Sequence, residues 1–248
     1  MNEFIYNLGY KFHKIALTQP ERIAIKTTND SISFIELEYL SNKIAHYLLQ
    51  NNIKKHSVVA ICNNKSIQAY AIMIACLKIG ATYTNLDSKS PVERLKRMIS
   101  TCNPSMFFYF SEANFTTQEI LQNNTCVSID YTLEGFKINI EQKPQDIPSS
   151  MYTVFGQTPA YIMFTSGSTG FPKGVVIAHA QVLRLIEWSQ VTYNSTCNDA
   201  FTNINPMHFD NSVFDFYASL FVGASLLPIS EQLTKNPRKM LDELNELR

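Results

Sequence analysis

One short segment concentrates residue types that bind phosphate. Residues 165–174 read Thr-Ser-Gly-Ser-Thr-Gly-Phe-Pro-Lys-Gly, so three of the eight glycines of the chain fall within ten residues. Glycine lets backbone N–H groups approach an anion closely, serine and threonine supply hydroxyl donors, and Lys173 adds a compact positive charge. This combination indicates a loop that cradles a triphosphate. A turn that binds nothing has a similar composition, so the residue types alone leave both interpretations open.

The flanks of this segment indicate which kind of loop it is. Residues 160–164 are apolar and aromatic, and residues 174–178 are rich in β-branched side chains, so the loop is predicted to join two strands. The Walker A pattern requires glycine directly before the lysine and serine or threonine directly after it. Pro172 and Gly174 occupy those positions here. The pattern therefore disfavours a P-loop nucleoside triphosphatase.

A second group of polar residues follows a predicted strand near residue 204. The segment 207–212 reads Met-His-Phe-Asp-Asn-Ser. Asp210 can meet the ammonium group of a ligand at short range, or it can cap the following helix without any ligand. His208 can pack beside a bound carboxylate, or it can be a partly buried loop histidine. The residue types leave these alternatives open.

The elements that must position these residues alternate along the chain. Strands are predicted at 23–27, 31–34, 58–62, 82–86, 105–110, 126–129, 201–204 and 225–229, and helices at 34–48, 66–78, 91–100, 180–192 and 212–221. Capping boxes are predicted for Ser33 with Glu36 and for Ser90 with Glu93. The stretch at about 134–157, rich in proline, serine and charge, is predicted to be a linker. The alternation indicates an α/β fold of layered sheets with flanking helices.

Composition excludes several classes of protein. Hydrophobic residues make up 45% of the chain, and the 21 basic residues balance the 21 acidic ones, so no basic face for nucleic acid is expected. The five cysteines lack paired spacing, which favours reduced thiols over a metal or redox site. No His/Cys/Asp cluster has metal-ligand spacing. No signal peptide or run of about 18 apolar residues occurs, so a cytoplasmic protein without a membrane partner is expected.

The loop sequence closely resembles the signature loop of the AMP-forming adenylating enzymes. These include acyl-CoA synthetases, nonribosomal peptide synthetase adenylation domains, luciferases and D-alanine carrier-protein ligases. Residues 31–37 resemble the family's "sYxEL" segment, residues 77–87 its "LKaGaaYvPlD" segment, and residues 209–212 the "FDxS" segment of amino-acid-activating members. The resemblance covers essentially the whole chain. It implies that residues 1–248 form the N-terminal part of the large domain of such an enzyme, with the C-terminal half absent.

The resemblance also implies roles for particular residues. It assigns the ATP phosphates to a set of loop residues: Thr165, Ser166, Gly167, Ser168, Thr169, Gly170 and Lys173. Mg²⁺ would be held mainly through the triphosphate, and no catalytic or metal-binding residue is assigned with certainty. Asp210 would bind the α-amino group of the substrate, His208 would pack beside the activated carboxylate, and Asn211 and Phe214 would line the side-chain pocket. His179 is expected to be structural and Trp188 to lie in the core.

The function implied is that of an ATP-dependent ligase. It would activate a carboxylic acid as an acyl-adenylate for transfer to a phosphopantetheine thiol on a carrier protein, and Asp210 favours an amino acid as the substrate. One alternative is an acyl- or aryl-CoA synthetase with coenzyme A as acceptor. Another is an inactive nucleotide-binding or interaction module, because the family's adenine, ribose and C-terminal lysine segments would lie beyond Arg248. The 248-residue chain alone is therefore expected to be inactive.

Overall fold

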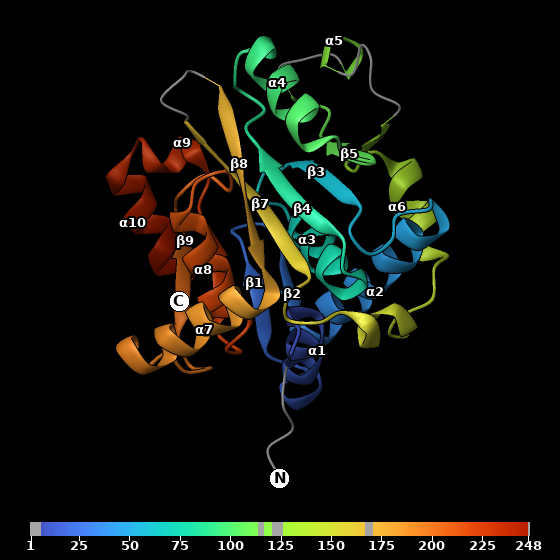
Figure 1. Ribbon diagram of the computed structural model, residues 1–248. Helices are drawn as coiled ribbons and strands as arrows, with labels where there is room; N and C mark the ends of the chain where they lie inside the picture. The colour runs from blue at the N-terminus through green and yellow to red at the C-terminus, as the bar shows by residue number, and fades with distance from the viewer. Residues whose placement is uncertain (1–5, 114–116, 121–125, 167–170, 248) are drawn as a thin grey trace.

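Two β-sheets and the helices around them make up the protein. The computed structural model describes residues 6–113, 117–120, 126–166 and 171–247 (Figure 1). A large core of buried apolar side chains lies between the two sheets, and a smaller one lies on the outer face of the larger sheet. This arrangement confirms the predicted α/β fold of layered sheets with flanking helices.

The larger sheet has six strands in the order β6-β5-β3-β4-β7-β8. They are β3 (Val58–Cys62), β4 (Thr82–Leu86), β5 (Met106–Tyr109), β6 (Val127–Asp130), β7 (Pro159–Ser166) and β8 (Pro172–Ala178). The five neighbouring strands β6, β5, β3, β4 and β7 run parallel to one another. Strand β8 pairs with β7 in the antiparallel direction, and Thr165 lies opposite Lys173 in this pair. The predicted strand–loop–strand arrangement around the Gly-rich segment is thereby confirmed. The carboxyl ends of β3, β4 and β7 consequently lie along one edge of the sheet.

The smaller sheet joins the two ends of the chain. Its order is β2-β1-β10-β9, with β1 (Ile23–Lys26), β2 (Ser31–Ser33), β9 (Ala200–Asn203) and β10 (Ser225–Pro228). The predicted N-terminal hairpin forms β1 and β2, and β1 pairs in parallel with β10. Strand β9, which leads into the segment carrying His208 and Asp210, is therefore anchored to the N-terminal hairpin through β10.

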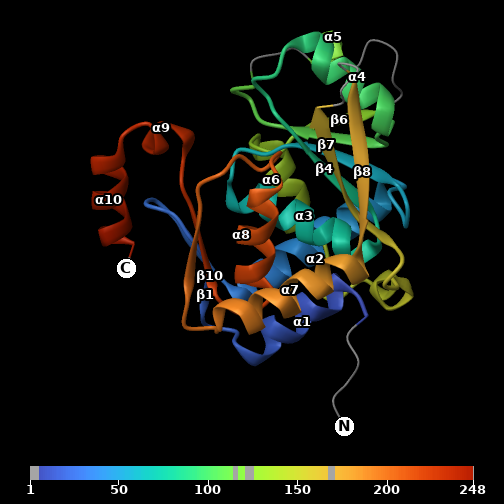
Figure 2. The ribbon, with the colours of Figure 1, turned by 60° about the vertical axis from the view of Figure 1, so that its left-hand side comes forward.

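Five helices, α1, α2, α3, α7 and α8, pack on or between the sheets on the inner side (Figures 1 and 2). Their bounds are α1 (Leu8–Thr18), α2 (Phe34–Gln50), α3 (Ile67–Ile79), α7 (His179–Tyr193) and α8 (Asn211–Leu220). Helix α3 is buried on all sides and ends at Gly80, whose φ of 70° is the left-handed conformation that glycine adopts without steric cost. Helix α8 lies against α3, where the rings of Phe216 and Tyr70 stack at 5.8 Å.

The remaining helices lie outside this layer. They are α4 (Val92–Cys102) and α5 (Thr117–Ile120) on the outer face of the six-stranded sheet, α6 (Glu134–Glu141) against α2, and α9 (Glu231–Thr234) and α10 (Pro237–Glu246) after the last strand. Helix α6 and the 3₁₀-helix Ser149–Thr153 occupy the stretch predicted as a linker. Helix α6 forms because Phe136 and Ile140, four residues apart, are both buried. None of the described helices is long and apolar enough to span a bilayer.

The two predicted capping boxes have different outcomes. The first is confirmed, since Ser33 Oγ accepts from the backbone N–H of Glu36 at 3.4 Å and the Glu36 carboxylate accepts from the N–H of Ser33 at 2.9 Å. The second prediction is wrong. Helix α4 begins at Val92, so its N-cap is Pro91, which has no side-chain acceptor. Ser90 lies one residue earlier and donates instead to Asp87 Oδ2 at 3.1 Å.

A buried ion pair joins the helices of the inner layer. Lys78 of α3 is fully buried, and its ammonium donates to Glu38 Oε2 at 2.7 Å, to Ser41 Oγ at 2.7 Å and to Asn42 Oδ1 at 2.6 Å. The other carboxylate oxygen of Glu38 lies 3.0 Å from His13 Nδ1 on α1. We refer to these five residues as the helix cluster. An ammonium has three N–H donors, so the helix cluster satisfies all of them.

Candidate functional site

A cleft of about 390 Å³ opens at the carboxyl ends of β4 and β7. Its walls come from three parts of the chain: Asp87, Ser90 and Arg94 from the β4–α4 side, Met163 and Thr165 from β7, and His208 and Asp210 from the segment before α8. In sheets with parallel strands, ligands bind just outside the carboxyl ends of the strands, because neighbouring connections leave a crevice there. The position of this cleft is therefore that of a ligand site.

Three of the predicted site residues come together in this cleft, and others do not. Thr165, His208 and Asp210 all line it, although they are up to 45 residues apart in the sequence. Lys173 is exposed on β8 opposite Thr165, without lining the cleft. Gly167, Ser168, Thr169 and Gly170 lie outside the described residues, as does the side chain of Ser166.

The residues predicted to line a side-chain pocket lie outside the cleft. Asn211 is exposed. Phe214, one turn further along α8, packs edge-on against Trp188 at 6.3 Å and Tyr193 at 5.6 Å between ring centroids. Trp188 is 50% exposed, so the expectation that it belongs to the core is wrong. It lies on α7, where its ring packs edge-on against Tyr193 and Phe214 and the rest of the side chain is exposed.

Asp210 is both a helix cap and a cleft residue. It is the N-cap of α8, and its Oδ1 accepts from the N–H of Asn211 at 2.9 Å. No protein group in the described part of the chain donates a hydrogen bond to Oδ2. Because the side chain is exposed and lines the cleft, this oxygen is available to a ligand. The two interpretations of Asp210 are therefore compatible with one another.

His208 is half-buried beside Asp87 and Arg94. Burial lowers the pKa of its imidazole, and the charge of Arg94 lowers it further, while Asp87 and Glu231 oppose the shift. The ring packs against Phe209 with 4.6 Å between ring centroids. A neutral imidazole at pH 7 follows, which can lie beside a carboxylate without forming an ion pair.

The cation that lines the described part of the cleft is Arg94, which the sequence analysis missed. Its guanidinium makes no hydrogen bond or ion pair within the described ranges, yet it stands beside His208 in the wall of the cleft. One helical turn further on, Arg97 lies over the ring of Phe171 at 4.9 Å, which connects α4 to the start of β8. The available signal was the pair of arginines at i and i+3 in a helix that directly follows a parallel strand.

The side chains that line the cleft could hold a metal ion only if a bound ligand supplied most of the coordinating oxygens. No group of three or more His, Cys, Asp or Glu side chains in the described ranges could hold a metal ion. Asp87 is engaged locally, since its oxygens accept from the N–H of Lys89 at 2.9 Å and from Ser90 Oγ at 3.1 Å. The free oxygen of Asp210 is one ligand, whereas Mg²⁺ needs about six oxygens, so the remaining ones would come from a triphosphate and water.

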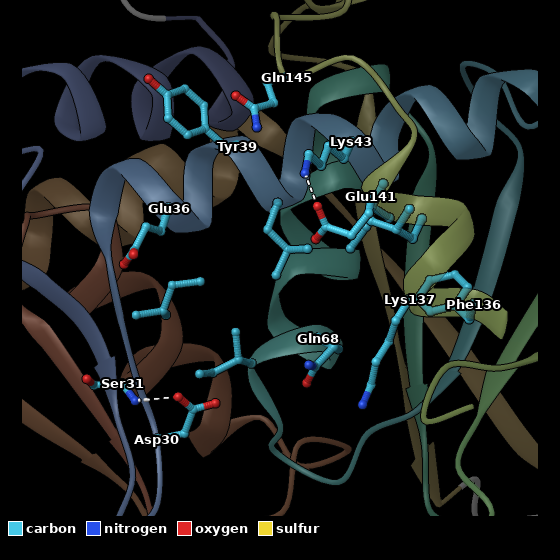
Figure 3. A pocket seen from close by; sticks show the side chains of 15 residues that line it. Asp30, Ser31, Glu36, Tyr39, Lys43, Gln68, Phe136, Lys137, Glu141 and Gln145 are labelled. Carbon is cyan, nitrogen blue, oxygen red and sulfur yellow. Dashed lines mark hydrogen bonds and ion pairs between the residues drawn. The ribbon is translucent and has the colours of Figure 1, made fainter. Parts of the chain in front are cut away.

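A larger hollow of about 470 Å³ lies elsewhere, between α2, α6 and the start of β2 (Figure 3). No residue lines both this hollow and the cleft. Its lysines already have partners, because Lys43 lies 2.5 Å from Glu141 and Lys137 lies 3.7 Å from Glu134. None of the predicted site residues lines it. Size alone therefore does not identify the functional site of this protein.

His179 has a structural environment. It is completely buried at the start of α7, and its Nδ1 accepts from the backbone N–H of Leu8 at 3.0 Å. Burial lowers the pKa of the ring to about 3. The neutral imidazole consequently holds the start of α1 against the start of α7, which fits the structural role expected for His179.

Sequence comparison identifies relatives along almost the whole chain. The family model described as AMP-binding enzyme matches residues 12–248. The chain is 31% identical over 229 residues to malpinin synthetase from Mortierella alpina, covering 92% of this chain and 3% of that protein. It is 28% identical over 229 residues to an L-proline–[L-prolyl-carrier protein] ligase from Pseudomonas fluorescens, covering 92% of this chain and 46% of that protein. The chain thus spans less than half the length of either relative.

Structural comparison shows the same fold in solved proteins. The N-terminal subdomain of NpsA from Klebsiella oxytoca superposes with a TM-score of 0.79 at 22% identity, covering 96% of this chain and 59% of that one. The same subdomain in complex with 3-hydroxybenzoyl-AMSN superposes with a TM-score of 0.78 at 24% identity. Together with the family match, these findings confirm the resemblance that the loop sequence indicated. The chain belongs to the AMP-binding enzyme family, among relatives that include malpinin synthetase and a carrier-protein ligase.

Proposed function

We propose that this chain forms the ATP- and acid-binding part of a ligase that activates an amino acid and passes it to a phosphopantetheine thiol on a carrier protein. The observation that carries the proposal is the convergence of Thr165, Arg94, His208 and Asp210 on one cleft at the carboxyl edge of the sheet. A hydroxyl and a guanidinium suit phosphate, and a carboxylate suits an ammonium group. The relatives support the acceptor, since one of them is named for a prolyl-carrier protein.

The reaction has two steps, both of which depend on positioning. In the first, a carboxylate oxygen of the amino acid attacks the α-phosphorus of ATP, and pyrophosphate leaves with the electron pair of the broken P–O bond. In the second, the thiol sulfur attacks the acyl carbon and AMP leaves, while the thiol proton passes to solvent. Holding the reactants in line and neutralising developing charge contribute most of the rate in such displacements.

Each cleft residue has a role in this scheme. Arg94 and Thr165 bind phosphate oxygens, with the loop residues 166–170 and Lys173 as further ligands. Asp210 binds the substrate ammonium through its free Oδ2, and the neutral His208 packs beside the carboxylate. Asn211 and Phe214 contact the substrate side chain where it leaves the cleft. Mg²⁺ bound to the triphosphate would offset its negative charge.

An acyl- or aryl-CoA synthetase is the second candidate. The observation that favours it is the hydrogen bond from the N–H of Asn211 to Asp210, which gives the carboxylate a local role that needs no ammonium. In that case coenzyme A is the acceptor and the substrate carries no amino group. An inactive nucleotide-binding module is the third, and it would use the phosphate side of the cleft alone.

Ligand-detected NMR on the 248-residue chain separates these candidates. We expect ATP to bind with an affinity no better than roughly millimolar, because the described cleft contacts mainly its phosphate end. Amino acids should show saturation transfer in the presence of ATP, and their des-amino analogues should not. Equal signals from both would favour the coenzyme A enzyme, ATP binding without any acid would favour the inactive module, and no ATP signal would contradict all three.

A further inference from the structure

Lys65 connects the two sheets at the start of the segment that carries His208 and Asp210. It lies between β3 and α3, at the carboxyl edge of the six-stranded sheet. Its ammonium donates to the backbone carbonyl oxygens of Asn203 at 2.7 Å, Ile204 at 2.9 Å and Ile229 at 2.8 Å. Asn203 is the last residue of β9, Ile204 follows it, and Ile229 is the first residue after β10, so all three carbonyls lie at the ends of strands in the smaller sheet. One side chain therefore ties the edge of one sheet to the edge of the other.

The geometry of this contact matches a protonated lysine. An ammonium has three N–H donors, and each of the three carbonyls receives one of them, whereas a neutral amine has only two donors. The backbone of Lys65 adopts a φ of 62°, a left-handed conformation that a residue with a side chain rarely takes. Strained residues of this kind persist where the surroundings hold them in place, and they cluster at functional sites.

The side chain of Asn203 extends this connection by hydrogen bonds to α3 and to the second turn of α8. Asn203 accepts from Tyr70 Oη at 2.8 Å through its side-chain oxygen, and its amide donates to Asp215 Oδ2 at 3.1 Å. Asp215 lies on α8 and is half-buried, so it is not the exposed surface charge that a helical aspartate usually provides. The segment 204–210 consequently leaves β9 at a point that Lys65 holds through the carbonyls and that Asn203 ties to the second turn of α8 through Asp215.

The charges that face Lys65 come from two helices. Asp215 of α8 and Glu231 of α9 both favour its ammonium form, and Tyr70 of α3 lies nearby as a neutral hydroxyl. Burial opposes these charges and is the larger effect, so the pKa of Lys65 is lowered to about 8. Mildly alkaline solution should therefore remove one of the three donors.

We propose that Lys65 is a positioning residue for the acid-binding side of the cleft, acting through the three carbonyls to hold the segment that presents His208 and Asp210. The identity of the ligand rests on the proposed function. The effect of Lys65 on the conformation of the segment does not depend on any ligand. The two parts can therefore be tested separately on the 248-residue chain.

Hydrogen exchange of the backbone amides tests the positioning. Replacing Lys65 by Met removes the three donors and keeps the length of the side chain, so exchange in residues 204–210 should become about tenfold faster while strand β4 is unchanged. Lys55→Met is the matched control, because Lys55 donates to one carbonyl, Thr153 O at 2.8 Å, and precedes β3 at the opposite edge. Unchanged exchange at 204–210 in the Lys65 variant would overturn the proposal.

The pH dependence of the wild-type chain needs no substitution and remains informative if Lys65→Met does not fold. Corrected for the intrinsic rate, protection of residues 204–210 should fall as pH rises through about 8, where Lys65 loses its proton. The guanidinium of Lys65→Arg stays protonated throughout this range, so protection in this variant should stay constant up to about pH 9.5. Wild type and Lys65→Arg behaving alike across this range would contradict the proposal.

Ligand affinity tests the connection to Asp210. Lys65→Met should lower the preference for an amino acid over its des-amino analogue by about fivefold, and should lower it no further once Asp210 is replaced by Asn. Equal loss for both ligands together with a lower melting temperature would show that Lys65 only stabilises the fold. If the wild type binds no acid, the proposed function fails, while the exchange experiment still decides whether Lys65 holds the segment.

Discussion

The helix cluster and the cleft contain the same kinds of side chain in opposite states. Each has a basic residue, a carboxylate and a histidine: Lys78, Glu38 and His13 in the helix cluster, and Arg94, Asp210 and His208 in the cleft. In the helix cluster the protein supplies a partner for every donor of Lys78 and for both oxygens of Glu38. In the described part of the cleft, Arg94 and one oxygen of Asp210 have none. The difference separates charges that the fold pairs internally from charges that remain available to a ligand.

The largest expected effect comes from breaking the helix cluster. Lys78→Met would leave the Glu38 carboxylate buried without its main counter-charge, and loss of one partner of a buried pair costs about 3–5 kcal/mol of stability. Equilibrium unfolding in urea measures this change directly. Lys96→Met, which removes a partly exposed lysine on α4 that pairs with the exposed Glu93, is the control and should cost less than about 1 kcal/mol. A loss below about 1 kcal/mol for Lys78→Met would show that the cluster is not what stabilises the helix layer.

Acid should weaken the same cluster. Burial alone would raise the pKa of Glu38, but Lys78 and His13 outweigh it and lower that pKa from 4.5 to about 2. A carboxyl group with a lowered folded pKa stabilises the fold above its unfolded pKa and loses that contribution as pH falls through the folded one. On the order of 3 kcal/mol should therefore disappear between pH 4.5 and pH 2. Unfolding curves of Glu38→Gln should lack this component, and equal acid sensitivity in both proteins would contradict the assignment.

The contrast between the two regions also explains which parts were predictable from sequence. Strand and helix patterns are local, so the β7–β8 hairpin and the cap at Ser33 could be found from neighbouring residues. Thr165, His208 and Asp210 could be found because each lies in a recognisable segment. Helix α6 was missed because only two of its residues, Phe136 and Ile140, are buried, and the polar remainder resembles a linker.

The missed site residues depend on long-range contacts. Arg94 is exposed on a helix, where sequence reasoning assigns arginine to solvent, and only the packing of α4 beside β7 and β8 brings it to the cleft. Lys65 contacts carbonyls 138 to 164 residues away, and no local pattern contains that information. Long-range pairing of this kind is set by sheet order, which the sequence pattern does not determine.

The next prediction concerns the cleft and tests the role of Asp210. Asp210→Asn removes the counter-charge for a substrate ammonium and should weaken amino-acid binding by about 1.5–3 kcal/mol, with little effect on des-amino analogues. Competition measured by ligand-detected NMR gives the ratio. Asp199→Asn is the matched control, because Asp199 also accepts from a nearby backbone N–H, that of Thr196, and lies outside the cleft. Equal weakening of both ligand types would instead support the cap as the sole role of Asp210.

Replacing Arg94 should weaken nucleotide binding by a smaller amount, and the size of this effect should depend on how many phosphate groups the nucleotide carries. Arg94→Ala removes one charge-assisted contact in an open, solvated cleft, so ATP binding should weaken by about 1–2 kcal/mol and AMP binding by less. Lys173→Ala tests whether the exposed lysine opposite Thr165 contributes as well. Titrations followed by the ³¹P signals of the nucleotide measure both variants. Arg94→Ala without effect on ATP would remove α4 from the phosphate site and leave the loop residues as its ligands.

The smallest expected effect concerns an ion pair whose two partners are both present but exposed to solvent. It tests whether pairing or burial determines how much a charged group stabilises the fold. Lys89 and Glu231 form an ion pair between the β4–α4 connection and α9, with side chains 58% and 47% exposed. The hydrogen bond from Lys89 and that from Lys235 lower the pKa of Glu231 to about 2. Water and salt nevertheless screen both charges, and such surface pairs contribute about 0–1 kcal/mol. Lys89→Ala should therefore change the free energy of unfolding by less than about 1 kcal/mol, although it breaks an ion pair just as Lys78→Met does. If urea unfolding showed a loss as large as that of Lys78→Met, pairing and not burial would set the stability of charged groups in this protein.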